Sequence, residues 1–272
     1  MTIDNPDEHK MPLVEHLIEL RKRLLVSVVF FFVAFIGCYY VSKDLYSYLV
    51  KPLSDAMAAH GDTGRHMIYT NLTEAFWTNV RVAAFASAFL CFPVWAGQLW
   101  AFVAPGLYKR EKKAFAPFLV ATPVLFLAGA ATVYYFVLPI ACRFFLSFEQ
   151  LAADTGPDGL PIELQAKVGE YLSLVMKFIF AFGIAYQMPV ALTLLARVGI
   201  LSSADLKAKR RYAIVGVFVA AAVLTPPDIF SQLSLAVPML LLYEVSILSC
   251  RWVERSKARE EMESQAEESA DP

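Results

Sequence analysis

The chain has 272 residues, of which 58% are hydrophobic and 18% are charged, and its formal net charge is −1. A soluble domain carries about a quarter charged residues, so this composition, with a mean hydropathy of +0.52, excludes an ordinary soluble protein. Several apolar stretches reach the ~20 residues that cross a bilayer as a helix. We therefore predict an all-α polytopic membrane protein.

Apolar runs limited by charged and turn residues predict six transmembrane helices, at about residues 24–42, 77–103, 115–138, 171–196, 212–225 and 232–249. At 1.5 Å per residue the fifth would extend about 21 Å, less than the ~30 Å hydrocarbon core, so spans five and six are expected to be short. Prolines within or at the ends of the spans predict a cupped, kinked bundle. We expect one membrane domain over residues 1–252 and a disordered acidic tail over 253–272.

The distribution of basic residues predicts the orientation. The N-terminus lacks the basic and apolar regions of a cleavable signal peptide, so the first span is expected to remain as an anchor. Most of the 24 Lys and Arg residues lie before span one, after spans two and four, and in the tail. By the positive-inside rule, both termini are predicted to be cytoplasmic.

A few polar residues lie at or near membrane depth, where they are costly. Gln187 lies within the fourth span, just before Pro189. Its amide is expected either to bond a carbonyl freed by that proline or to contact a partner helix. Asp228 lies in the turn between spans five and six, near Thr225 and Gln232, where it could simply cap the sixth span.

Two carboxylates stand in strongly basic segments on the predicted cytoplasmic side. Glu19 lies in "HLIELRKRLL" and Glu111 in "APGLYKREKKAFAP". In a helix, Glu19 lies one turn from Arg23, and such a pair contributes only ~0.3–0.5 kcal/mol. The alternative is a pair of carboxylates that binds a basic ligand, arginine before lysine, because a guanidinium bonds a carboxylate bidentately.

Four motifs occur in one order along the chain: "HLIELRKRLL", "QLWAFVAPGLYKREKK", "YLSLVMKFIFAFGIAYQMPVAL" and "LTPPDIFSQ". From about residue 12 to 252 the chain resembles the TatC family, the signal-peptide receptor of the bacterial twin-arginine translocase. The resemblance implies six helices in a cupped fold, with both ends in the cytoplasm, in the bacterial inner membrane. It also implies export of folded proteins with TatA and TatB, driven by the proton-motive force, in a multi-copy receptor complex.

The resemblance also implies roles for individual residues. Glu19 and Glu111 match the glutamates that hold the twin arginines of the signal peptide, and Arg21 and Phe102 match further positions of the signal-binding face. Pro52 matches a sensitive structural position.

The resemblance places contacts with partner helices at the outer end of spans five and six, at Thr225, Asp228 and Gln232. Gln187 stands where some relatives have glutamate. Because the amide is neutral, only a hydrogen-bonding role with a partner helix carries over to it.

Two other functional classes have less support. A small-solute transporter usually has an internal repeat as well as intramembrane charges, and the sequence shows no repeat between its halves. An intramembrane enzyme would need a motif such as H-E-x-x-H or G-x-S-x-G, and all four histidines lie outside the predicted spans. We predict no catalytic residue, metal site, cofactor or nucleic-acid partner.

Overall fold

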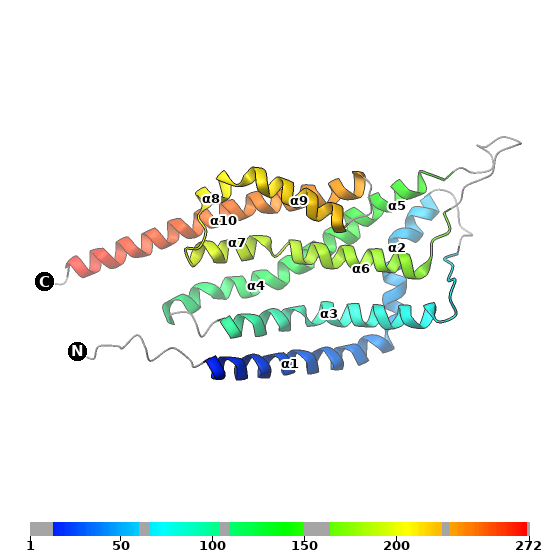
Figure 1. Cartoon of the computed structure of the whole chain (residues 1–272), viewed down its shortest axis with the longest axis horizontal. Coiled ribbons are helices and arrows are strands. Elements are labelled where there is room, and N and C mark those ends of the chain that lie inside the picture. The colour runs from blue at the N-terminus through cyan, green and yellow to red at the C-terminus, as the bar shows by residue number, and fades with distance from the viewer. Residues whose placement is uncertain (1–12, 60–65, 104–108, 150–163, 225–228, 271–272) are drawn as a thin grey trace, which may run out of the picture. The chain divides into compact units, whose positions relative to one another are not determined.

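A computed structural model describes residues 13–59, 66–103, 109–149, 164–224 and 229–270 (Figure 1). Within these ranges the regular elements are helices, and one isolated parallel bridge joins Ile68 to Lys167. The elements are α1 Leu13–Tyr40, α2 Ser42–Ala59, α3 Glu74–Val103, α4 Lys109–Thr132, the π-helix η3 Val133–Val137, α5 Leu138–Leu146, α6 Val168–Ala185, α7 Met188–Arg197, α8 Ser203–Ala208, α9 Arg210–Leu224 and α10 Ile229–Ala270. The prediction of an all-α protein is confirmed.

Five helical stretches in the described ranges are long and apolar enough to cross a membrane. They are Leu17–Tyr40, Glu74–Phe102, Pro117–Leu146, Val168–Arg197 and Ser231–Arg259. The remaining predicted span, 212–225, coincides with α9, whose 15 residues extend only about 22 Å. The chain is therefore a multi-pass membrane protein with one helix shorter than a full span.

The C-terminal segment differs from the prediction of disorder over residues 253–272. α10 continues without interruption to Ala270. The segment is rich in Ala, Glu, Lys and Arg, which have high helix propensity. It extends a helix that is already formed, so no new nucleation step opposes it.

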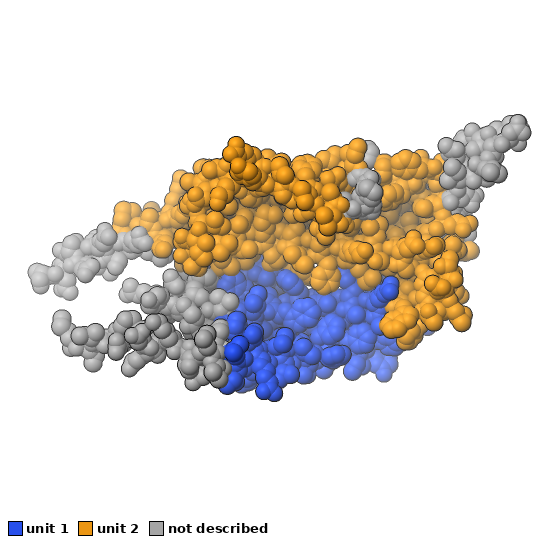
Figure 2. Space-filling model, in the orientation of Figure 1, with its two compact units in different colours: residues 1–46, 79–123 blue, residues 47–78, 124–272 orange. Residues whose placement is uncertain are grey.

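The chain divides into two compact units, whereas the sequence favours one domain over residues 1–252. The first unit comprises residues 1–46 and 79–123, and the second comprises residues 47–78 and 124–272 (Figure 2). Within the first unit, only 6% of the apolar window of α1 is buried inside the protein. Most of that helix therefore presents its side chains to lipid or to a partner.

In the second unit, α10 packs along α7, α8 and α9 (Figure 1). The Tyr243 hydroxyl donates to the Leu206 carbonyl at 2.8 Å. Glu254 accepts hydrogen bonds from the backbone and the hydroxyl of Ser203, both at 2.6 Å. These bonds attach the short helix α8 to the long helix α10.

Two glycines allow α4 and α6 to approach closely in the second unit. A Cβ atom on Gly129 would lie 2.8 Å from the Phe182 carbonyl oxygen, and one on Gly183 would lie 2.5 Å from the Phe126 ring. Neither distance is compatible with a side chain, so both positions require glycine.

Prolines interrupt the backbone hydrogen bonds at defined places. Pro139 and Pro189 lie at the starts of α5 and α7, where a missing N–H is tolerated. The π-helix η3 immediately precedes Pro139, and its last turn closes when the Leu138 N–H donates to the Val133 carbonyl. Such single-turn π-helices are frequent at functional sites.

Candidate functional site

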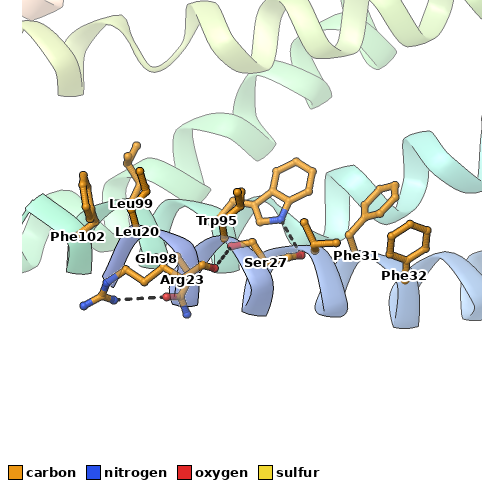
Figure 3. A pocket seen from close by; sticks show the side chains of 11 residues that line it. Leu20, Arg23, Ser27, Phe31, Phe32, Trp95, Gln98, Leu99 and Phe102 are labelled. Atoms are coloured by element: carbon orange, nitrogen blue, oxygen red, sulfur yellow. Dashed lines mark hydrogen bonds between the residues drawn. The ribbon is translucent and has the colours of Figure 1, made fainter. Parts of the chain in front are cut away.

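The first unit contains an apolar groove of about 520 Å³ between α1 and α3 (Figure 3). It is lined by Leu20, Arg23, Leu24, Ser27, Val28, Phe31, Phe32, Trp95, Gln98, Leu99 and Phe102. Arg23 and Gln98 are the long polar side chains among them. The groove can therefore take an apolar segment whose end carries a polar or charged group.

Contacts between α1 and α3 hold the groove in shape. The Trp95 indole N–H donates to the Ser27 carbonyl at 3.4 Å, and the Trp95 ring lies 6.0 Å from the Phe31 ring, centre to centre. The Ser27 hydroxyl donates in turn to the Arg23 carbonyl at 3.0 Å. Figure 3 shows Phe31 and Phe32 toward one end of the groove and Phe102 at the other.

Glu19 is half-buried beside the groove and pairs with Arg23. Its Oε1 accepts from Nε of Arg23 at 3.0 Å and from Nη2 at 2.5 Å. Arg23 Nη1 reaches Gln98 Oε1 at 3.4 Å, so the pair is tied to α3. The structure therefore forms the intrahelical ion pair that the one-turn spacing allows.

The second carboxylate oxygen of Glu19 has a different environment. Oε2 is buried and accepts no hydrogen bond from the residues that the structure describes. Buried polar atoms are nearly always hydrogen-bonded, so this oxygen is an acceptor suited to an incoming donor. Pairing through Oε1 keeps the carboxylate oriented.

The other predicted signal-binding residues lie in different settings. Phe102 lines the groove. Arg21 is exposed on α1 and does not line it. Glu111 lies in the first turn of α4, but its side chain is outside the described part of the structure. The structure thus relates Glu19 and Phe102 to one groove and leaves Glu111 untested.

Gln187 lies between α6 and α7, where the backbone breaks. The Gln187 N–H bonds the Ile184 carbonyl instead of that of Gly183. The Gln187 side-chain amide then donates to the Gly183 carbonyl at 3.3 Å. An internal bond from the Gln187 amide is present, but its acceptor is the Gly183 carbonyl and not that of Ala185, which Pro189 leaves without a helical donor.

Of the three partner contacts predicted between spans five and six, Gln232 is the one that the structure describes. Its amide donates to the Phe218 carbonyl at 3.2 Å and joins α10 to α9. Thr225 and Asp228 lie outside the described residues.

Pro52 is buried in α2, and its effect on the backbone can be followed directly. In a regular helix the Tyr48 carbonyl would accept from the N–H of residue 52, which proline lacks. The Tyr134 hydroxyl from η3 donates to that carbonyl instead, at 2.8 Å. Pro52 therefore opens an acceptor through which η3 is joined to α2.

Sequence reasoning missed Gln98, Trp95 and Tyr134. Each bonds a residue at least 68 positions away in the chain. No local pattern signals such a contact. Within the described residues, no group of three or more His, Cys, Asp or Glu side chains could hold a metal ion.

Comparison with known proteins gives a consistent result. Residues 15–238 match the family model for the Sec-independent protein translocase protein (TatC). The chain is 47% identical over 264 residues to the Sec-independent protein translocase protein TatC of Magnetococcus marinus, covering 97% of this chain and 93% of that protein. It is 39% identical over 255 residues to the TatC protein of Escherichia coli K12, covering 93% and 94% of the two chains.

A solved structure is also similar. The crystal structure of the twin arginine translocase receptor TatC has a TM-score of 0.72 and 33% sequence identity to this chain. The match covers 88% of this chain and 99% of that one.

Proposed function

Because the chain belongs to the TatC family of Sec-independent protein translocase proteins, we propose that it is the core receptor of the twin-arginine translocase. It binds twin-arginine signal peptides at its cytoplasmic face and, with TatA and TatB, exports folded proteins by means of the proton-motive force. The family consists of translocase components and not of enzymes. The chain therefore acts through binding and assembly rather than catalysis.

The environment of Glu19 carries this proposal. A half-buried carboxylate with one oxygen held by Arg23 and the other without a donor among the described residues lies next to an apolar groove. A twin-arginine signal combines guanidinium groups with neighbouring apolar residues. Its guanidinium would donate to Oε2 in a charge-assisted bond, while the apolar residues enter the groove beside Phe102.

The remaining signal-binding residues complete the proposed site. Glu111 supplies a second carboxylate for the second arginine of the signal. Arg21 lies exposed on the same helix as Glu19 and belongs to the proposed signal-binding face.

We place the contacts with TatA and TatB at the end of α9 and the start of α10, around Thr225, Asp228 and Gln232. Gln232 holds the two helices together, and exposed apolar side chains such as Val223 and Leu233 lie close by in the sequence. The helix break at Gln187 offers a further polar position for a partner helix. Several copies of the receptor would assemble through such surfaces.

The proposal includes the membrane topology. We count α9 as the fifth of six spans, sheltered by neighbours or placed in a locally thinned bilayer because it is short. Both termini then lie in the cytoplasm, and the membrane is the bacterial inner membrane. The distribution of Lys and Arg supports this orientation.

The decisive experiment combines crosslinking with binding. A photoreactive residue at position 19 or 111 should crosslink a twin-arginine signal peptide and fail to crosslink the twin-lysine peptide. Glu19→Gln should weaken binding of the twin-arginine peptide at least about tenfold, because a charge-assisted hydrogen bond contributes about 1.5 kcal/mol or more. Asp44→Asn, an exposed acid in the first turn of α2, is the matched control. Unchanged affinity in both Glu19→Gln and Glu111→Gln would refute this site.

A further inference from the structure

A second pocket, of about 450 Å³, lies wholly within the second unit between α2, η3 and α5. Its lining includes three charged side chains, Lys51, Asp55 and Arg143, and three tyrosines, Tyr48, Tyr134 and Tyr135. Polar and charged groups thus make up much of this pocket, unlike the apolar groove between α1 and α3. The signal-binding role proposed above uses none of these residues. Pro52, which also lines the pocket, has a structural role in α2.

Contacts within the protein itself hold the walls of this pocket in place. The rings of Tyr48 and Tyr134 stack with their centres 4.5 Å apart and their planes 2° from parallel. The Tyr134 hydroxyl bonds the Tyr48 carbonyl that Pro52 leaves without a helical donor. Behind the pocket, α2 and α5 share a buried apolar cluster that includes Leu53 and Leu146.

The pocket lies near the end of a helical stretch that is long and apolar enough to cross a membrane. Arg143 is three residues before the end of the apolar stretch Pro117–Leu146, a rise of about 4.5 Å. Lys51 lies on α2, which begins just after the apolar stretch Leu17–Tyr40 ends. Tyrosines are enriched at this level of a membrane protein. Lipid headgroups are therefore the most abundant ligands within reach.

The charges specify which headgroup fits. Lys51, Arg143 and Asp55 form no salt bridge with one another or with any other residue that the structure describes. Two cations suit a phosphodiester, to which arginine donates in a fixed fork and lysine as a point charge. Asp55 would repel a second anionic group but attract an ammonium, and the faces of the tyrosine rings also attract cations.

We propose that this pocket binds a phospholipid with an ethanolamine headgroup, whose phosphate contacts Lys51 and Arg143 and whose ammonium contacts Asp55. The bound lipid would fasten α2 against η3 and α5. The proposal is independent of signal-peptide binding.

The test uses the full chain purified in detergent and titrated with phosphatidylethanolamine, phosphatidylglycerol or inorganic phosphate, with binding followed by native mass spectrometry. The unaltered protein should retain phosphatidylethanolamine at about tenfold lower concentration than phosphatidylglycerol, the difference expected for one charge-assisted bond. Inorganic phosphate should not displace the lipid. This comparison needs no variant, so it remains decisive if a substitution prevents insertion.

Variants then locate the site. Lys51→Gln and Arg143→Gln should each weaken phosphatidylethanolamine binding about tenfold, and Asp55→Asn should abolish the preference over phosphatidylglycerol. Lys43→Gln, an exposed lysine of α2 outside the pocket, should bind as the unaltered protein does. Equal binding of the two lipids, displacement by phosphate, or unchanged binding in both Lys51→Gln and Arg143→Gln would overturn the proposal.

Discussion

The bond between the Tyr134 hydroxyl and the Tyr48 carbonyl offers a sharp test of why Pro52 stands in α2. Tyr134→Phe keeps the stacked ring and removes only the 2.8 Å hydrogen bond. A hydrogen bond contributes about 0.5–1.5 kcal/mol net, and this one is solvent-exposed, so a loss of about 0.5–1 kcal/mol is expected. For a chain of this size that corresponds to a decrease in Tm of about 1–4 °C.

The same substitution should behave differently when residue 52 has an N–H. In Pro52→Ala the helix supplies its own donor to the Tyr48 carbonyl, so Tyr134→Phe should then lower Tm by much less. Thermal unfolding of the four proteins in detergent measures this coupling, because any cost of losing the proline ring cancels in the double-mutant cycle. Tyr40→Phe, at an 84% exposed tyrosine, controls for the loss of a hydroxyl.

An equal decrease in Tm in both backgrounds would refute this account of Pro52. The hydroxyl of Tyr134 would then act independently of the missing N–H. An equal decrease in Tyr40→Phe would show that the measurement does not resolve the bond.

Three further predictions concern positions elsewhere in the chain. Gly183→Ala should destabilise the protein by about 1–3 kcal/mol through overpacking against Phe126, which a lower Tm would report. Gly37→Ala is the control and should leave Tm unchanged, because its added Cβ has no atom within 4 Å. Gln187→Leu should lower the stability of the purified protein without any partner by about 1 kcal/mol, because the Gly183 carbonyl loses its donor; unchanged Tm would favour a partner contact instead. The Ser202 hydroxyl and N–H hold the pKa of Asp205 below its usual range, so the cap of α8 is intact above the unfolded pKa of about 3.9 and is lost as pH falls through the lower folded value. Hydrogen-exchange protection factors in α8, which are corrected for the pH dependence of intrinsic exchange, should therefore fall in acid, and Asp205→Asn should remove that decrease.

Local sequence patterns were sufficient for much of this protein. The long apolar runs identify the membrane helices, because transfer of apolar side chains into lipid depends on composition and length and not on partners. The one-turn spacing of Glu19 and Arg23 anticipates their ion pair, since it is a contact within one helix. The tail beyond residue 252 was mispredicted because low hydrophobicity indicated disorder, whereas high helix propensity continued α10 to Ala270.

Contacts between distant segments could not be obtained in this way. Gln98 lies 75 positions from Arg23, and Tyr134 lies 86 positions from Tyr48. No repeating pattern in the sequence marks either pair. The choice of helix faces that come together depends on packing summed over many side chains. The sequence by itself determined that the chain is a multi-pass membrane protein and where its long helices lie. It also singled out Glu19 within a basic segment. Only the tertiary structure decided that, among the described residues, one oxygen of Glu19 has a partner and the other has none. It also decided that a tyrosine from η3 compensates a proline in α2.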